Sequence, residues 1–400
     1  MNNKPLRVII SGGGTAGHIY PAVATADALR AELGAEGVEI LFVGAEGKME
    51  MERVPKAGYE IEGLPVAGLQ RRLLSGANFA LPLKVWRSVR RARRIVREFR
   101  PDVAVGFGGY ASAPVLWAAQ RMGVPTVIQE QNSYAGLTNR LLGRRARAIC
   151  VAYEGMERFF PAPRIVLTGN PLRGAFGAEV SRPSAELRRE AAAYFGFEEA
   201  AAAGQDKGRV KTKERKTLFV TGGSLGAGTM NRCVLGALDR LAERADEVQV
   251  IWQNGRYYDA QLAGAIGERP GGLPRNVWRG AFVERMDLAY ALADVVVARA
   301  GACTVSELEL LGRAGIFVPS PNVAEDHQTK NARALADREA AVLVADGAAE
   351  REAMACALEL LADDRRRELL AANILRLGRP EAAAEVARTV IRIANEYGKR

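Results

Sequence analysis

The sequence predicts an α/β protein built from two doubly wound, Rossmann-like domains that face each other across a cleft. An apolar run, Leu6–Ile10, leads through a glycine-rich turn into an alanine-rich segment whose apolar residues recur at helical spacing. The same order returns at Thr217, where Gly222–Gly228 opens a second helix. With 400 residues the chain is also too long for one ordinary core, which favours two domains.

The composition, 48% hydrophobic and 26% charged residues, is that of a globular protein and excludes a disordered chain. The four cysteines stand far apart without a C-x-x-C pair, which disfavours a zinc site or disulfide framework and suits a reducing cytoplasm. The N-terminus lacks a signal-peptide layout, and no apolar run reaches the length of a membrane span. We therefore expect the protein to remain in the cytoplasm.

Residues 1–170 are expected to form the first domain. Its predicted strands are Leu6–Ile10, Val38–Val43, Tyr59–Leu64, Val103–Val105, Thr126–Ile128 and, as the last one, Ala148–Val151. Its predicted helices are Pro21–Leu33, Met49–Lys56 and Leu81–Phe99, the last of them stopped by Pro101. Repeated β-α units of this kind indicate a mostly parallel sheet covered by helices on both faces.

Residues 171–379 are expected to form the second domain. Its predicted strands are Thr217–Val220, Val248–Trp252, Asp294–Ala298 and Ile316–Val318, and its predicted helices are Ala185–Phe195, one from near Thr304, and His327–Leu335. The polar run Glu198–Lys216 has no periodicity and is interpreted as a mobile surface insertion. A terminal helix, Ala382–Tyr397, could pack on either domain, the first included.

Most of the net charge of +10 is concentrated in one segment. Between Arg71 and Arg100 ten basic residues face a single acid, Glu98. A local basic surface indicates an anionic partner such as a membrane, a nucleic acid or a phosphorylated substrate. Apolar residues, Trp86 among them, lie between the arginines and favour an amphipathic surface that binds anionic bilayers. The alternative is a solvated helix with its leucines and Trp86 in the core.

Ligands of open parallel sheets bind at the carboxyl ends of the strands, where the polar and glycine-rich stretches of this chain fall. Gly12, Gly14 and Gly17 fit G-x-G-x-x-G, in which free N–H groups at a helix start face a phosphate. A plain tight turn is the alternative. In the second domain, Ser224 and its neighbouring N–H groups suit a diphosphate.

A helix that starts near Thr304 would add its positive end to that diphosphate site. Glu307 offers two acceptor oxygens to the hydroxyls of a ribose, or is only a first-turn acid that the helix dipole favours. Gln328 and Asn331 stand one helical turn apart, so both could reach a sugar, or both are ordinary surface amides.

Seven motifs occur in a fixed order: GGGTAGH at 12–18, GGYASAP at 108–114, EQN at 130–132 followed by Asn139, GNPLR at 169–173, GGSLGA at 222–227, RAGACTVSE at 299–307 and DHQTKNA at 326–332. Together they resemble the MurG family, the UDP-N-acetylglucosamine–N-acetylmuramyl-(pentapeptide) pyrophosphoryl-undecaprenol N-acetylglucosaminyltransferases of peptidoglycan synthesis. The resemblance runs from near residue 6 to about 345 and implies the GT-B glycosyltransferase fold.

That resemblance implies transfer of GlcNAc from UDP-GlcNAc to the 4-hydroxyl of MurNAc in lipid I, giving lipid II with inversion. It implies a peripheral enzyme on the cytoplasmic face of the plasma membrane, with no nucleic-acid partner. The donor contacts that it implies are Thr15, Ala16, Gly17, Asn132, Arg173, Ser224, Val283, Ala302, Cys303, Thr304, Val305, Ser306, Glu307 and Gln328. Other matching positions, for the acceptor or for structure, are Gly14, Gly109, Tyr110, Asn139, Asn231, Arg299 and Asn331.

Within these contacts, Arg173 is expected near the diphosphate, Glu307 on the ribose, and Ala302 and Cys303 beside the uracil. The chain departs from the family pattern at three positions. Gln129 stands where a histidine is often found, Ala300 replaces a frequent serine, and Cys303 replaces a frequent leucine.

Inversion requires a base that takes the proton of the acceptor hydroxyl. His18, one of only two histidines, is the expected base because an imidazole titrates near 6.5, about neutral pH. Its alternative role is to orient the turn. Glu130 is the rival base, or it only positions the acceptor. No D-x-D sequence occurs to hold a metal, so we expect no cofactor and a leaving diphosphate held by N–H groups, the helix dipole and Arg173. A divalent ion on the diphosphate of lipid I stays open.

Two other classes of protein fit part of the sequence. A nicotinamide-dependent oxidoreductase fits G-x-G-x-x-G, but Glu46 lies further on than the usual interval of about 20 residues, and the second glycine loop stays unexplained. A non-catalytic protein that binds an anionic surface or nucleic acid would account for the positive charge of Arg71–Arg100. It would not account for the polar residues at the carboxyl ends of the strands.

Overall fold

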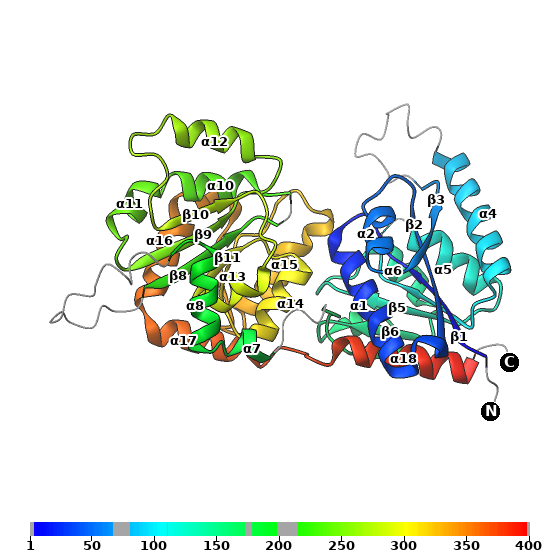
Figure 1. Ribbon diagram of the computed structural model, residues 1–400. Helices are drawn as coiled ribbons and strands as arrows, with labels where there is room; N and C mark the ends of the chain where they lie inside the picture. The colour runs from blue at the N-terminus through cyan, green and yellow to red at the C-terminus, as the bar shows by residue number, and fades with distance from the viewer. Residues whose placement is uncertain are drawn as a thin grey trace. The chain divides into compact units, whose positions relative to one another are not determined.

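The computed structural model describes residues 4–66, 81–109, 111–172, 178–197, 215–223 and 225–397. The chain forms two compact units, shown in Figure 1. The first unit comprises Met1–Gly174 together with Arg379–Arg400, and the second comprises Ala175–Gly378. The chain thus leaves the first unit four residues beyond the expected boundary and returns to it for its last helix.

The first unit contains a parallel sheet with the strand order β3-β2-β1-β4-β5-β6-β7 in the described residues. Its strands are β1 (Leu6–Ser11), β2 (Val38–Ala45), β3 (Glu60–Leu64), β4 (Val103–Gly106), β5 (Thr126–Glu130), β6 (Ala148–Val151) and β7 (Ile165–Leu167). Residues 8–10 of β1 are fully buried, as expected for a central strand of β-branched residues. The order of strands reverses between β1 and β4, which is where such sheets bind ligands.

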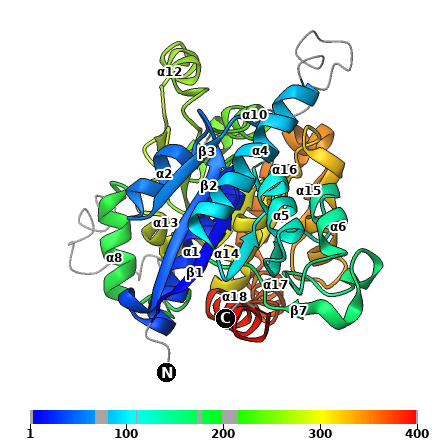
Figure 2. The same cartoon turned by 90° about the vertical axis from the view of Figure 1, so that its right-hand side faces the viewer.

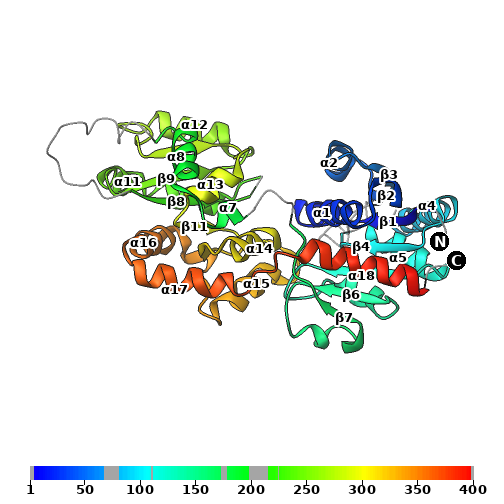
Figure 3. The same ribbon diagram turned by 60° about the horizontal axis from the view of Figure 1, so that its bottom comes forward.

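Helices cover both faces of this sheet. They are α1 (Ala16–Leu33), α2 (Glu50–Lys56), α4 (Leu81–Phe99), α5 (Ser112–Arg121), α6 (Leu137–Gly143) and α18 (Ala382–Tyr397). Helix α18 lies beside α1, and its Val386, Val390 and Ile393 join the core on the α1 face (Figure 3). Helices α4 and α5 lie together on the other face, seen in Figure 2.

The residues of α4 that point into the sheet are small or apolar, because Ala92, Ile95 and Val96 recur at helical spacing. Arginines occupy the remaining faces of the helix. Trp86 is 55% exposed, so the alternative that places it in the core is wrong. Residues 71–80 of the basic segment lie outside the described residues.

The second unit repeats this plan with the strand order β10-β9-β8-β11-β12-β13, again parallel. Its described strands are β8 (Lys216–Thr221), β9 (Val248–Gln253), β10 (Val277–Gly280), β11 (Val295–Ala298), β12 (Ala314–Phe317) and β13 (Val342–Leu343). Its described helices are α7 (Ala178–Ser181), α8 (Ala185–Tyr194), α10 (Gly228–Leu235), α11 (Leu238–Glu243), α12 (Asp259–Gly267), α13 (Met286–Leu292), α14 (Ala302–Leu311), α15 (His327–Ala336), α16 (Ala349–Ala362) and α17 (Asp364–Leu375).

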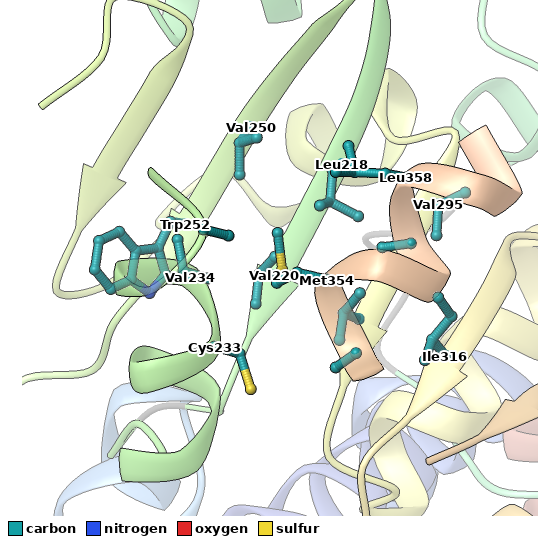
Figure 4. Close-up of a cluster of buried hydrophobic side chains, with 14 of the residues drawn as sticks. Leu218, Val220, Cys233, Val234, Val250, Trp252, Val295, Ile316, Met354 and Leu358 are labelled. Atoms are coloured by element: carbon teal, nitrogen blue, oxygen red, sulfur yellow. The ribbon is translucent and has the colours of Figure 1, made fainter. Parts of the chain in front are cut away.

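The core of this unit forms where α10 and α16 pack on one face of the sheet. Figure 4 shows Leu218 and Val220 of β8 meeting Met354 and Leu358 of α16, with Trp252 of β9 beside α10. Burial of these side chains rigidifies β8 and β11, whose carboxyl ends carry the loops of the predicted donor site.

Three expectations need correction. The first helix begins at Ala16 rather than Pro21, so His18 lies in its first turn instead of in the preceding loop. The last strand of the first unit is β7, not Ala148–Val151; β7 has three half-buried residues, too few for a periodic signal. Lys216 starts β8, so the expected insertion ends earlier, and residues 198–214 lie outside the described chain.

Candidate functional site

The site of the first unit is built on two glycine turns whose backbones touch. One turn follows β1 and the other follows the neighbouring strand β4. A Cβ atom on Gly109 would lie 2.2 Å from the carbonyl oxygen of Gly13, and Gly109 has a φ of +81°. A Cβ atom on Gly12 would lie 2.8 Å from Cβ of Phe107. Glycine is therefore required for the two turns to meet at this point.

A buried carboxylate holds the first of these turns. Glu50, the first residue of α2, accepts hydrogen bonds from the N–H groups of Gly14 and Ala45, each at 3.0 Å. Its Oε1 atom lies against Gly13, where a Cβ would come within 2.1 Å of it. The predicted phosphate cradle is therefore wrong at Gly14, because that N–H group already binds a carboxylate of the chain itself. Glu50 was missed, since an acid in a first helical turn is an ordinary sequence feature.

His18 extends from the first turn of α1 toward the segment that follows β5. Its Nδ1 atom lies 3.1 Å from Oε1 of Gln131. The ring lies against Gly108, where a Cβ would come within 3.1 Å of Cε1. The structure thus brings together groups from the ends of β1, β4 and β5, and Gln131 is a contact that sequence reasoning did not single out.

Glu130 is the last residue of β5 and is only 2% exposed. One carboxylate oxygen accepts from the backbone and side-chain nitrogens of Asn132, and the other accepts from Gly136 N–H at 3.2 Å and Asn139 Nδ2 at 2.9 Å. Burial raises the pKa of Glu130, and these hydrogen bonds oppose that effect. The geometry favours a role in organising the 130–139 segment over a role as the general base.

The site of the second unit lies where its strand order reverses, between β8 and β11. The loop after β8 turns through a hydrogen bond from Gly226 N–H to Gly223 O at 2.9 Å. It packs on the loop after β9, since a Cβ on Gly226 would lie 2.2 Å from Asn254 O. After β11, helix α14 begins at Ala302 with no acidic side chain in its first turn. This helix start is therefore open to an anionic group.

Glu307 is the sixth residue of α14, so the alternative of a first-turn acid does not apply. The hydroxyl of Tyr290 donates to its Oε2 atom at 2.7 Å. Burial raises the pKa of Glu307 to about 7. Burial, with the nearby Glu307 charge, also raises the pKa of Cys303 to about 12, so Cys303 is a neutral thiol and not a nucleophile.

Several predicted contact residues hold the loops in place. Asn231 links the indole N–H of Trp252 to Asn254 O, and Arg299 donates to Val318 O, Pro319 O and Asp346. The amide of the fully buried Asn331 donates to Ala300 O at 3.3 Å, so this side chain is not presented to a sugar.

Among the predicted donor residues, Ala302, Cys303 and Thr304 are partly exposed, as are Gly17 and Asn132. Val283, Val305 and Ser306 are buried, and a ligand would meet the valines through their backbone. Gln328 accepts from Ser320 N–H at 2.8 Å through Oε1, so its contact with a ligand would use Nε2. The side chain of Ala16 and the whole of Tyr110, Arg173 and Ser224 lie outside the described residues.

Within the described ranges, no three His, Cys, Asp or Glu side chains come close enough together to hold a metal ion. None of the helices described has the length and apolar character that a membrane crossing requires.

Two doubly wound units, each with its polar groups at the reversal of strand order, define a GT-B glycosyltransferase fold. Residues 8–151 match the glycosyltransferase family 28 N-terminal domain, and residues 217–386 match the glycosyltransferase family 28 C-terminal domain. The chain therefore belongs to glycosyltransferase family 28. Relatives 48–50% identical over nearly its full length place it, within that family, among the MurG enzymes.

The relatives extend over the whole chain. A UDP-N-acetylglucosamine–N-acetylmuramyl-(pentapeptide) pyrophosphoryl-undecaprenol N-acetylglucosamine transferase of Parabacteroides distasonis is 48% identical over 98% of this chain and 100% of its own length. The protein of the same name from Bacteroides fragilis is 50% identical over 99% of both chains. The crystal structure of Acinetobacter baumannii MurG aligns with a TM-score of 0.71 and 26% identity over 97% of this chain and all of that one.

Proposed function

We propose that this chain transfers GlcNAc from UDP-GlcNAc to the 4-hydroxyl of MurNAc in lipid I and so forms lipid II for cell wall synthesis. The observation that carries this proposal is the near-full-length identity of 48–50% to transferases named for this donor and this acceptor. A product that feeds peptidoglycan synthesis also connects the enzyme to cell shape and division.

The proposed reaction is a single displacement that inverts the anomeric carbon. The acceptor oxygen attacks C1 of GlcNAc, the bond from C1 to the UDP oxygen breaks, and its electron pair goes to the diphosphate. His18 takes the proton of the acceptor hydroxyl. The choice of His18 over Glu130 is supported by burial, since His18 is partly exposed whereas the oxygens of Glu130 already accept hydrogen bonds from Asn132, Gly136 and Asn139.

The second unit binds the donor in this proposal. The N–H groups at the start of α14 and Ser224 bind the diphosphate, Glu307 accepts a hydrogen bond from the ribose, and Ala302 and Cys303 adjoin the uracil. Arg173, which precedes the second unit in the chain, is kept as a further expected contact of the diphosphate. The chain has no D-x-D sequence, so the mechanism assigns stabilisation of the leaving diphosphate to N–H groups and Arg173 rather than to a metal.

The first unit binds an anionic membrane surface at the cytoplasmic face, where a lipid-linked acceptor lies. Supporting this, the guanidinium of Arg90 lies 5.4 Å from the exposed ring of Trp86. Trp117 of the adjacent helix α5 has two cations near its ring, Arg93 of α4 at 5.1 Å and Arg121 of α5 at 5.2 Å. An aromatic ring surrounded by cations suits the interface of an anionic bilayer.

Thermal unfolding with nucleotides tests the donor assignment. At about 100 times its Kd, a ligand that binds only the folded chain stabilises it by about 2.7 kcal/mol. UDP-GlcNAc should therefore raise the Tm by several degrees and NADH should leave it unchanged. A rise with NADH alone would contradict the proposal and favour an oxidoreductase.

A further inference from the structure

A chain of three buried side-chain amides ends at His18. Gln129, Gln131 and Asn170 are 0%, 1% and 4% exposed. Nε2 of Gln131 donates to Phe107 O at 2.8 Å and to Oε1 of Gln129. Nε2 of Gln129 donates to Oδ1 of Asn170 at 3.0 Å.

Backbone carbonyls determine which end of each of these amides donates and which accepts. A carbonyl oxygen can only accept, so the end of Gln131 that faces Phe107 O must be its NH2 group, and Oε1 must face His18. In the same way Asn170 donates through Nδ2 to Gln131 O at 3.1 Å, which turns its Oδ1 toward Gln129. The orientations of the Gln131 and Asn170 amides are thus each fixed by a backbone carbonyl, and the orientation of Gln129 between them agrees with both.

The orientation of Gln131 determines which nitrogen of the His18 imidazole carries the proton. Oε1 of Gln131 can only accept, so the Nδ1 atom that faces it at 3.1 Å must carry the proton. In a neutral ring the other nitrogen, Nε2, then holds the lone pair. A base needs that lone pair, and a ring that is free to exchange tautomers would hold it at Nε2 only part of the time.

We propose that Asn170, Gln129 and Gln131 are positioning residues that lock neutral His18 in the Nδ1-protonated tautomer and make Nε2 the nitrogen that receives the acceptor proton. The part concerning the acceptor rests on the proposed function. The locked tautomer is a property of the folded chain and is measured without substrate.

The two histidines of the chain make the measurement direct. After labelling with 15N-histidine, only His18 and His327 contribute imidazole signals, and a His327→Gln variant assigns them. We expect neutral His18 to be protonated at Nδ1 in the free protein. A ring that is protonated at Nε2, or that exchanges freely between the two tautomers, overturns the proposal.

Variants of Gln131 show whether this side chain sets the tautomer of His18 or only fills space in the core. Gln131→Met keeps the length of the side chain but offers His18 no comparable acceptor, so the ring should become a mixture of tautomers. The Tm should also fall, because Phe107 O and Gln129 Oε1 lose their donor, so the tautomer rather than the Tm is the readout. Gln131→Glu keeps an acceptor and adds a charge, so the Nδ1 proton should remain and the ring should titrate at least one pH unit higher. A tautomer that is unchanged in Gln131→Met would overturn the proposal even if that variant were inactive.

Two substitutions of Gln129 provide a matched pair of variants. It must donate to Asn170 and accept from Gln131, and a neutral histidine can do both whereas leucine can do neither. Gln129→His should retain the Nδ1 tautomer of His18, and Gln129→Leu should lose it. Since Gln129→His adds a third imidazole, its signal is assigned by comparison with the parent spectrum.

Kinetic measurements then separate the locked tautomer of His18 from its role as the general base. If the tautomer behaves as expected but His18→Ala keeps its kcat, the positioning chain stands and the catalytic role of His18 fails. If His18→Ala loses activity while the wild-type ring is not locked, the proposed function stands and the positioning chain fails.

Discussion

The Nδ1 atom of His18 lies 3.1 Å from the Oε1 atom of Gln131, although 113 positions separate the two residues in the chain. They meet because His18 follows β1, Gln131 follows β5, and the carboxyl ends of parallel strands lie at one edge of the sheet. Gly108, which follows the intervening strand β4, leaves room for the ring. The site of the first unit, where the strand order reverses between β1 and β4, is therefore built from the ends of three neighbouring strands.

Removal of His18 tests the base directly. His18→Ala should lower kcat by a factor of about 10² to 10⁴, the usual contribution of a general base. The Kd for UDP-GlcNAc, measured by calorimetry, should stay within about threefold, since His18 is not among the expected donor contacts. A variant that retains most of its kcat would remove His18 from that role.

Glu130→Gln should act on stability. Four nitrogen donors, from Asn132, Gly136 and Asn139, point at the two carboxylate oxygens, and an amide replaces one of those acceptors with a donor. We expect a loss of about 1–3 kcal/mol in the free energy of unfolding, measured in urea. Wild-type stability combined with a thousandfold lower kcat would instead identify Glu130 as the base.

Donor binding should depend on the ionisation of Glu307, whose pKa is raised to about 7. Because a carboxylate accepts hydroxyl hydrogen bonds better than a carboxylic acid does, the Kd for UDP should increase as the pH falls from 8 to 6. Glu307→Gln should bind UDP with little pH dependence over that range. An identical pH profile in both proteins would contradict the ribose assignment.

The same shift in Glu307 has a consequence for stability. Its pKa rises from 4.5 to about 7 on folding, so the folded chain holds this proton more tightly than the unfolded chain does. The contribution is fully present below pH 4.5 and is lost as the pH rises through 7. Relative to Glu307→Gln, the wild-type Tm should therefore fall across this window.

Gly109→Ala should disrupt the contact between the glycine turns. Its φ of +81° is unfavourable for alanine, and the added Cβ would lie 2.2 Å from Gly13 O. We expect a loss of about 2 kcal/mol or more in stability. Gly136→Ala is the matched control, because nothing lies within 4 Å of its added Cβ and its φ is −63°; equal losses in both variants would be inconsistent with the packed turns.

Charge reversal on α4 tests the membrane proposal. Each basic residue near an anionic bilayer contributes about 1 kcal/mol, so the combined change of Arg87, Arg90 and Arg91 to glutamate should lower vesicle affinity by about 100-fold or more. The measurement is sedimentation with vesicles that contain anionic lipid, at one fixed salt concentration.

A triple variant of the second unit provides the control for that change. Arg351, Arg365 and Arg366 are exposed, and their replacement by glutamate alters the net charge by the same amount. This control should bind vesicles nearly as the wild type does. Equal binding by both triple variants and the wild type would refute a membrane surface on α4.

The fold could be predicted because its signals are local. In each unit a buried strand, a glycine turn and a helix follow one another within about 30 consecutive residues. The strands β7, β10 and β13 escaped prediction because they have three, four and two residues and lie at the ends of their sheets. Their assignment depends on pairing with β6, β9 and β12, which no local pattern records.

The site was predictable in outline but not in its contacts. His18, Glu130 and Glu307 were identified by their chemical type and their positions after strands. The partners Glu50, Gln131 and Tyr290 were not, because each meets its target only after the sheet forms. Which of two candidate bases is buried and hydrogen-bonded is likewise a property of the packed structure.

The central claim is tested most directly by transfer of radiolabelled GlcNAc from UDP-GlcNAc to a lipid I analogue, with UDP-GalNAc as the alternative donor and His18→Ala in parallel. We expect labelled disaccharide-lipid from UDP-GlcNAc alone and at least a hundredfold slower formation by the variant. The absence of both transfer and UDP binding in the wild-type protein would contradict it.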